Sequence, residues 1–223
     1  MSKIIYNIYR YLFARKMFSK LNKLLYNCSI RGLGIYNYEN MSLSGEKSFI
    51  DKTIKKIAAS NKEILVFDVG ANQGDYTNLL VNEIKNIKIL SFEPHPKTFK
   101  ILSNNCKQTN VELFNCALSS KEGTLELFDY VSKDGSSHAS LNEEIFSTIH
   151  NSAIVSHKVN VSTIETICQQ NNINEIDFLK IDVEGYERDV LHGALNMVQS
   201  NSIKIIQFEF TQLNTTTRVY FKD

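Results

Sequence analysis

One apolar segment that breaks into a glycine-rich turn constrains the fold of this chain more than any other feature. Residues 63–77 read EILVFDVGANQGDYT, a strand-length apolar run followed by Gly70 and Gly74. Glycine lets the backbone approach a ligand where a Cβ atom would collide, and a helix that starts near Asp75 would point its free N–H groups at an anion. The next apolar run ends at Glu93, about where a carboxylate binds ribose in nucleotide-binding βαβ units. The pattern predicts a site for an adenosine-containing cofactor.

The glycine spacing distinguishes between cofactors. A dinucleotide site needs G-x-G-x-x-G because the pyrophosphate lies against the turn, but residues 70–74 read GANQG and place Asn72 where phosphate would press. S-adenosylmethionine has no phosphate, and acidic Asp68 and polar Asn72 suit its ammonium and ribose groups better than a pyrophosphate. An ordinary strand–turn–helix corner, with Asp68 capping the turn, would also explain the segment.

A second motif makes a family resemblance recognisable. Residues 177–193 read DFLKIDVEGYERDVLHG, a near-continuous apolar strand that ends in acidic residues and leads into a helix. With this motif the chain resembles the FkbM-type methyltransferases, which are S-adenosylmethionine-dependent O-methyltransferases. The resemblance runs from about Gly32 to the last residue, and DVEG followed by a helix is its most specific part. The matching segments are Phe67–Thr77, Phe92–Pro96, Asn115–Leu127, Phe178–Ala194, Ile205–Phe210 and residues 217–223.

Strand and helix patterns alternate from Ile64 onward, which predicts a mostly parallel sheet with helices on both faces. The predicted strands are Ile64–Val69, Ile87–Glu93, Val111–Asn115, Asp177–Asp182 and Ile203–Phe210. The predicted helices are Tyr76–Lys85, Lys97–Cys106, Val161–Gln170 and Tyr186–Gln199. Thr124–Tyr130 alternates like an antiparallel strand, and His157–Val161 could pair with it. The resemblance implies an α/β, class I methyltransferase (Rossmann-like) fold with this pair as an insertion.

The order of the patterns also predicts a domain organisation. We expect a helical, basic extension at residues 1–50 and a methyltransferase domain at residues 51–223. A class I methyltransferase sheet normally closes with two further strands, whereas residues 211–223 offer at most the start of a helix at Arg218. The sequence therefore predicts a C-terminally incomplete sheet with an open edge, and an open edge can pair with another chain to give a homo-oligomer.

The carboxyl ends of the predicted strands supply the candidate site residues, because ligands bind at that edge of such sheets. The cofactor-binding candidates are Asp68, Gly70, Asn72, Gly74, Glu93, Ala117 and Leu118. The catalytic candidates are Asp182, Glu184 and Glu209.

The roles of the acidic candidates stay open at this point. In an extended backbone Asp182 and Glu184 would point the same way, so one could act as a general base, or both could hold a divalent cation. Alternatively, Glu184 caps the start of the next helix. His95 and His138 have side chains suited to proton transfer, yet a lone loop histidine is more often a bystander.

Together these features predict an enzyme, an S-adenosylmethionine-dependent O-methyltransferase. Its partner would be a small-molecule or glycan acceptor, methylated on a hydroxyl of a sugar, a polysaccharide or a secondary metabolite. A non-catalytic cofactor-binding subunit or a truncated inactive form is the alternative; a nicotinamide-dependent oxidoreductase would leave the DVEG segment without a role. The polar stretch Asp129–His157 is either part of the acceptor pocket, a lid, or a disordered loop.

Composition and charge limit the partners. A hydrophobic content of 43% and a formal charge of +1 indicate a globular protein without electrostatic support for nucleic-acid binding. The four cysteines lack C-x-x-C pairing and are typical of reduced thiols in a cytoplasmic protein.

The N-terminal residues 1–26 are aromatic, basic and rich in isoleucine. They contain no apolar run near the ~18 residues that a spanning helix needs and no signal-peptide core. Plotted as one helix, their apolar positions occupy most of the circle. We expect a helix that packs on the domain or on a second subunit, or a weak membrane-surface contact.

Overall fold

The computed structural model describes residues 2–34, 41–59, 63–131, 135, 139–141, 153–210, 214 and 219. The chain divides into two compact units, Met1–Ile54 and Lys55–Asp223.

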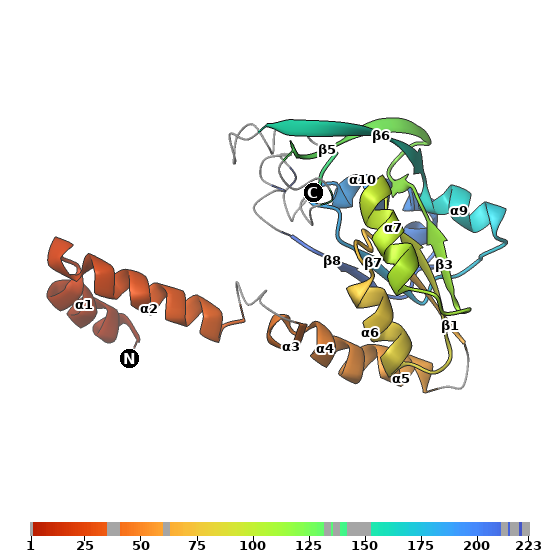
Figure 1. Cartoon of the computed structure of the whole chain (residues 1–223). Coiled ribbons are helices and arrows are strands. Elements are labelled where there is room, and N and C mark those ends of the chain that lie inside the picture. Colours follow the sequence, from red (N-terminus) through yellow and green to blue (C-terminus); the bar gives the residue numbers. More distant parts are fainter. Residues whose placement is uncertain are drawn as a thin grey trace. The chain divides into compact units, whose positions relative to one another are not determined.

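The first unit is helical (Figure 1). Helix α1 (Ser2–Phe13) is followed by a 3-10 turn (Lys16–Phe18) and by α2 (Ser19–Gly32). The chain reverses between the two helices: Tyr9 donates a hydrogen bond to the side chain of Asn22, and Asn22 donates one to the carbonyl of Phe13. The two helices therefore form a hairpin. Short helices α3 (Met41–Ser44) and α4 (Glu46–Phe49) and a π-helical turn (Ile50–Ile54) complete the unit.

The second unit is built on a five-stranded parallel sheet. After α5 (Lys55–Ala58), the sheet has the order β3-β2-β1-β7-β8, and every neighbouring pair is parallel. The strands are β1 (Ile64–Val69), β2 (Ile87–Phe92), β3 (Val111–Phe114), β7 (Phe178–Ile181) and β8 (Ile206–Phe208). This confirms the predicted α/β fold with a mostly parallel sheet.

Helices cover both faces of the sheet, as its buried apolar strands require. On one face, α6 (Asp75–Glu83) places Tyr76 and Thr77 over β1, β7 and β8, and α7 (Pro96–Asn105) packs Leu102 near β3. On the other face, α9 (Ile164–Gln170) and α10 (Glu187–His192) pack against β1, β2 and β7. The largest cluster of buried apolar residues lies on this second face.

A smaller sheet contains the predicted antiparallel pair. β5 (Gly123–Tyr130) pairs antiparallel with β6 (Ile154–Ser162), and β4 (Ala117–Leu118) pairs parallel with β6. The pair exists as predicted, but β6 is longer than His157–Val161. Most of the polar stretch between the two strands, His138 included, lies outside the described residues, so its predicted role in the acceptor pocket stays a prediction.

Several predicted boundaries were wrong, and the structure gives the reason for each of two helix boundaries. Helix α9 begins at Ile164 because the Thr163 side chain accepts a hydrogen bond from the N–H of Thr166, while Val161 remains in β6. The helix predicted at Tyr186–Gln199 is divided into α10 and α11 (Leu195–Gln199) at Gly193. A Cβ atom on Gly193 would lie 2.1 Å from the carbonyl oxygen of Ser119, so the chain passes too close there for any other residue.

The last strand is also shorter than the predicted Ile203–Phe210. Ile203 forms only an isolated bridge with Ile176, and β8 covers Ile206–Phe208. The helix start predicted at Arg218 lies outside the described residues. The predicted open edge beyond β8 stays a prediction, because only residues 214 and 219 are described after Phe210.

Candidate active site

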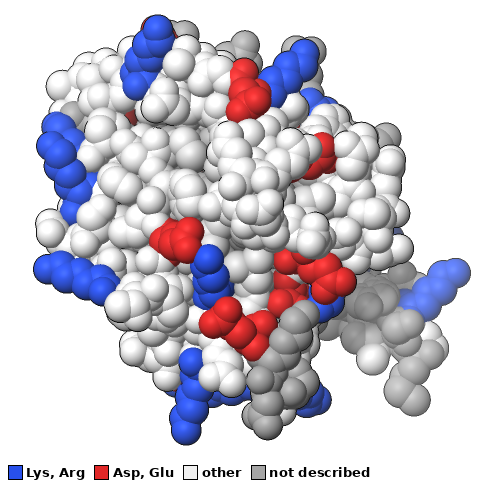
Figure 2. All heavy atoms as spheres, turned by 90° about the vertical axis from the view of Figure 1, so that its right-hand side faces the viewer, with Lys and Arg blue, Asp and Glu red and all other residues white. Residues whose placement is uncertain are grey.

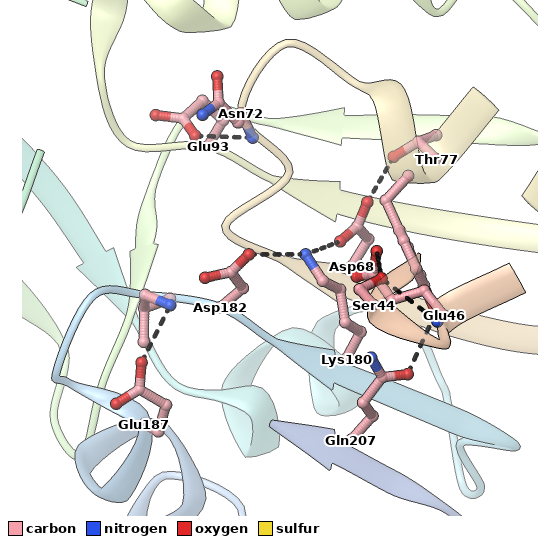
Figure 3. Close-up of polar contacts among 12 residues, drawn as sticks. Ser44, Glu46, Asp68, Asn72, Thr77, Glu93, Lys180, Asp182, Glu187 and Gln207 are labelled. Atoms are coloured by element: carbon pink, nitrogen blue, oxygen red, sulfur yellow. Dashed lines mark hydrogen bonds and ion pairs between the residues drawn. The ribbon is translucent and has the colours of Figure 1, made fainter. Parts of the chain in front are cut away.

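The carboxyl ends of β1, β2 and β7 meet at one edge of the sheet, and the backbone holds them together there. The N–H groups of Gly70 and Ala71 both donate to the carbonyl of Phe92 at 3.0 Å. The N–H of Asp182 donates to the carbonyl of Val69 at 2.9 Å. The predicted candidates Glu93 and Asp182 therefore lie at the same edge, and Asp68 lies near them inside the end of β1, as Figure 3 shows.

The turn after β1 requires both of its glycines. Gly70 and Gly74 have φ angles of +82° and +92°, a region that residues with a Cβ rarely adopt. A Cβ on Gly70 would lie 1.8 Å from the carbonyl oxygen of Asp182, and one on Gly74 would lie 2.5 Å from Cys106 Sγ. The close approach that needs glycine is thus to the protein's own β7 end and to α7. Asn72, with φ +50°, completes the left-handed path of the turn.

A row of polar side chains crosses the sheet two residues before the residues at this edge. Ser91, Asp68, Lys180 and Gln207 are register neighbours on β2, β1, β7 and β8. We call these four residues the polar row. Helix α6 covers the row: Thr77 Oγ1 donates to Asp68 Oδ2 at 2.7 Å and lies 2.9 Å from Ser91 Oγ.

Asp68 is fully buried, and only one of its oxygens has a hydrogen bond. Oδ2 accepts from Thr77, whereas Oδ1 has no hydrogen-bond partner among the described residues. Lys180 Nζ lies 3.7 Å from Oδ1, close enough for an ion pair but beyond hydrogen-bond distance. A buried anionic oxygen without a donor is costly, so this atom is suited to a donor supplied by a ligand.

Lys180 connects the two sides of the site. Its side chain is 6% exposed, and Nζ lies 3.2 Å from Asp182 Oδ2, on the opposite side from Asp68 (Figure 3). The ammonium also lies 4.9 Å from the ring centroid of Tyr76, within the range of a cation–π contact. The sequence interpretation missed Lys180, although a lysine inside the apolar strand FLKI was a signal, because a buried lysine needs partners.

Glu93 is held from two directions by backbone N–H groups. Oε2 accepts from Asn72 at 3.0 Å and Oε1 accepts from His95 at 2.7 Å. Burial raises the pKa of Glu93 to about 7, mainly through desolvation, although the hydrogen bonds from His95 and Asn72 lower it. The glycine turn and the end of β2 are thereby joined at the carboxylate where ribose binding was predicted.

His95 has a structural role in the described residues. Its side chain caps α7 by accepting from the N–H groups of Lys97 and Thr98 through Nδ1, and Nε2 lies 3.6 Å from buried Asp129 Oδ2. The ring is also in edge contact with His157, at 4.6 Å between centroids. Accepting from two N–H groups leaves Nδ1 without a free lone pair, so we assign His95 to positioning the helix that follows Glu93.

The DVEG segment differs from the extended geometry assumed in the sequence interpretation. β7 ends at Ile181, and Glu184 and Gly185 have φ angles of +51° and +99°. Asp182 and Glu184 are therefore separated by a turn. Glu187, the first residue of α10, accepts instead from two N–H groups that precede the helix, those of Val183 and Gly185, at 3.2 and 3.1 Å.

Glu187 is almost fully buried, and burial raises the pKa of its carboxyl. Asn214 donates to its second oxygen at 2.6 Å. Glu187 thus stabilises the DVEG turn. The N-cap of α10 is Tyr186, without a side-chain cap hydrogen bond, so the alternative that Glu184 caps this helix was wrong. Glu209 follows β8, donates its N–H to the carbonyl of Ile181 and is exposed.

Ala117 and Leu118 lie in β4 rather than at a free strand end. Leu118 packs into the large apolar cluster, and Ala117 is 6% exposed. A contact of either residue with a cofactor would therefore come mainly from its backbone.

The described residues also bear on metal binding and on insertion into membranes. They contain no cluster of three or more His, Cys, Asp or Glu side chains that could hold a metal ion. Their helices include none with the length and apolar character needed to cross a bilayer.

Comparison with known proteins identifies the family. The model of the FkbM methyltransferase domain matches residues 68–223. Methyltransferase 1 of Beauveria bassiana is 28% identical over 175 residues, covering 70% of each chain. Methyltransferase sdnD of Sordaria araneosa is 28% identical over 156 residues, covering 58% of this chain and 60% of the relative. The hexuronic acid methyltransferase AglP of Haloferax volcanii is 25% identical over 175 residues, covering 74% and 63%.

A solved structure, a precorrin-6y C5,15-methyltransferase from Geobacter metallireducens, aligns with a TM-score of 0.38 and 13% identity. The alignment covers 74% of this chain and 65% of that one. The family match begins at Asp68 and contains the glycine turn, Glu93, the polar row and the DVEG segment. The chain belongs to the FkbM methyltransferase family and is a methyltransferase.

Proposed function

We propose that this protein is an S-adenosylmethionine-dependent O-methyltransferase that acts on a hydroxyl group of a sugar, a polysaccharide or a secondary metabolite. The observation that carries the proposal is the pair of buried carboxylates, Asp68 and Glu93, at the ends of adjacent strands beside the glycine turn. A sugar is the favoured acceptor because one relative is named as a hexuronic acid methyltransferase.

Asp68 fits the methionine end of the cofactor. Its Oδ1 atom is a buried acceptor that lacks a hydrogen bond. An ammonium group can donate a hydrogen bond to this oxygen and also carries the opposite charge. Lys180, at 3.7 Å, offsets part of the carboxylate charge without filling the acceptor position.

Glu93 fits the ribose end. An ionised carboxylate offers about four lone-pair sites, and the backbone of Asn72 and His95 uses one on each oxygen. The same two bonds fix the orientation of the carboxylate, so its remaining acceptor capacity is directed before a ligand arrives. Two hydroxyl groups of a ribose match that capacity.

When bound, S-adenosylmethionine supplies a methyl group that is already activated by its sulfonium. The chain's own residues then have to orient the acceptor hydroxyl, exclude water and take the hydroxyl proton. We assign proton removal to Asp182, because its side chain is 32% exposed and can reach an acceptor, while Lys180 holds its Oδ2 atom at 3.2 Å. Glu184 and Glu209 stay candidates for contacts with the acceptor.

Lys180 is the positioning residue in this scheme. It holds Asp182, on the acceptor side, at a set place relative to Asp68, on the cofactor side. Its ammonium supplies positive charge to Asp68 and Asp182, so a divalent cation held by Asp182 and Glu184, the pair considered in the sequence analysis, would compete with Lys180 for Asp182. Activity that persists with a chelator would support this arrangement, and activity that depends on added Mg²⁺ would contradict it.

The proposal is tested with the full chain, methyl-labelled S-adenosylmethionine and a panel of uronic acid, neutral sugar and alcohol acceptors, with mass spectrometry of the products. Asp182→Asn should keep cofactor affinity and lose roughly 10²–10⁴-fold in turnover. Glu122→Gln, at an exposed position outside the site, is the matched control. A folded chain that does not bind the cofactor in calorimetry would refute the proposal. Cofactor binding without transfer to any acceptor would favour the non-catalytic subunit.

A further inference from the structure

The helical hairpin of the first unit is strongly basic. The part of the chain from residue 1 to residue 34 contains no Asp or Glu, and the first acidic residue is Glu39. The same part contains Lys3, Arg10, Arg15, Lys16, Lys20, Lys23 and Arg31. We call α1, the turn and α2 together the basic hairpin.

The basic hairpin also exposes large apolar side chains. On α1, Ile4, Ile5 and Ile8 are 66%, 58% and 54% exposed. On α2, Leu24 and Tyr26 are 59% and 62% exposed. No residue of α2 is buried. Soluble surfaces rarely concentrate so many large apolar groups unless they bind a partner.

Helix α1 separates its apolar and basic residues, with Ile4, Ile5 and Ile8 on one face and Lys3 and Arg10 on the other. Leu21, Leu24, Leu25 and Cys28 stand at positions i, i+3, i+4 and i+7 of α2, which places them on one face. Of the basic residues of α2, Lys23 lies off that face, whereas Lys20 and Arg31, four residues before and seven after Leu24, border it. Arg15, between the helices, has an extended backbone. The regular rotation of about 100° per residue is interrupted there, so a plot of residues 1–26 as one helix gives the residues of α2 the wrong angular positions relative to those of α1. Taken as a separate helix, α1 has an amphipathic character that the plot of residues 1–26 as one helix does not show.

We propose that the basic hairpin docks on the surface of an anionic lipid membrane. Its isoleucine, leucine and tyrosine side chains would enter the boundary between headgroups and acyl chains, and its lysine and arginine side chains would contact lipid phosphates. The helices have 12 and 14 residues, too short to cross a bilayer core, so the hairpin lies on the membrane.

Charge favours this partner over the alternatives. Seven basic residues give residues 1–34 a formal charge of +7, and the total of +1 leaves −6 for residues 35–223. Two hairpins that faced each other in a dimer would repel, because each carries a formal charge of +7. On the face of the protein drawn in Figure 2, acidic and basic side chains are interspersed among neutral ones, so that face offers no uniformly acidic surface to a second copy's hairpin. A nucleic acid would match the charge but not the apolar residues.

The first test measures sedimentation of the full chain with lipid vesicles. Binding should be strong to vesicles that contain phosphatidylglycerol, weak to pure phosphatidylcholine, and reduced by salt. Replacing Lys16, Lys20 and Lys23 by Gln should weaken binding about 100-fold, at roughly fivefold for each charge near the surface. The matched control replaces three exposed lysines of the second unit, Lys85, Lys100 and Lys121, by Gln and should bind like the wild type.

A fluorescence test locates the contact. The chain contains no tryptophan, so Leu24→Trp introduces a single reporter on the basic hairpin and Leu195→Trp a single reporter on the second unit. Anionic vesicles should shift the emission of the first to shorter wavelength and leave the second unchanged.

Equal binding to neutral and anionic vesicles, equal shifts of both reporters, or the same loss in the control variant would overturn the proposal. A dimer in light scattering that the hairpin substitutions dissociate, or tighter binding to an oligonucleotide than to vesicles, would assign the hairpin to that other partner. Circular dichroism checks that each variant is folded.

Discussion

Replacing Glu93 by Gln should remove a pH dependence of the protein's stability while it weakens cofactor binding. Glu93 is buried and its pKa is raised from 4.5 to about 7, chiefly by desolvation. Its ionised form is therefore disfavoured in the folded protein relative to the unfolded chain. Gln resembles the protonated acid in shape and does not ionise, so the substitution removes this term.

The magnitude follows from the shift in pKa. Between pH 4.5 and pH 7 the folded state holds a proton on Glu93 that the unfolded state has lost, so the wild type loses stability as the pH rises through this window. At 1.36 kcal/mol per unit, the term is about 3 kcal/mol in total and about 2.5 kcal/mol between pH 5 and pH 8. The stability of Glu93→Gln relative to the wild type should rise by that amount over the same interval.

Urea denaturation of both proteins at pH 5 and pH 8 measures this difference. Glu122→Gln, an exposed carboxylate removed, is the control and should follow the wild type at both pH values. Parallel behaviour of Glu93→Gln and the wild type would show that Glu93 is not a destabilising buried charge, and the reasoning would fail.

The same variant should bind S-adenosylmethionine more weakly by about 2–4 kcal/mol, because the ribose would lose charge-assisted hydrogen bonds. In the wild type, affinity should fall as the pH drops below about 7, where Glu93 gains its proton. Calorimetry over this range measures both effects. Unchanged affinity in the variant would remove Glu93 from the cofactor site while leaving the stability argument intact.

Other substitutions test the packing around the site. Lys180→Met leaves buried Asp68 without its nearby cation and should destabilise the fold by about 3–5 kcal/mol in urea denaturation; adding Asp68→Asn should recover much of the loss. Gly70→Ala should cost about 3 kcal/mol or more, because its Cβ would meet a carbonyl oxygen at 1.8 Å, whereas Gly32→Ala, with nothing within 4 Å, should be neutral or slightly stabilising. His95→Ala should cost about 1 kcal/mol by removing a helix cap, and His95→Asn should restore it.

The sheet was predictable because its strands are buried on both faces. Such strands read as unbroken apolar runs, and the predicted strands from Ile64, Ile87 and Val111 begin where β1, β2 and β3 begin. The same logic placed Asp68 and Glu93 at one edge, since the carboxyl ends of parallel strands coincide. Periodicity could not reveal the break at Gly193, because the cause is a contact with Ser119, far away in the sequence.

The details of the site depend on turns that a pattern does not specify. The expectation for Asp182 and Glu184 assumed an extended backbone, but a left-handed residue at position 184 redirects the chain. Glu187, two residues beyond the DVEG letters, then becomes the acceptor that stabilises the turn. The hydrogen bond from the Asn72 N–H to Glu93 joins residues 21 positions apart, and no local sequence pattern predicts it.

One signal in the sequence could nevertheless have located the polar row. The four strands end in S-F-E, D-V-G, K-I-D and Q-F-E, so a polar residue stands two positions before Glu93, Gly70, Asp182 and Glu209. Residues two apart in a strand share a face, and parallel strands that end together bring equivalent positions into register. The row and the edge residues therefore form two successive lines across one face of the sheet.

This arrangement explains why the edge contains one glycine among three acidic residues. Gly70 occupies the position on β1 between the ends of β2 and β7, where the chain must turn under the carbonyl of Asp182. An acidic side chain there would add a third carboxylate between Glu93 and Asp182. The charge that β1 does contribute, on Asp68, sits one pleat deeper, beside Lys180 as its register neighbour. Lys180 can thus form ion pairs with a carboxylate in each line, Asp68 in the row and Asp182 at the edge. A lysine one residue earlier or later on β7 would point to the other face of the sheet.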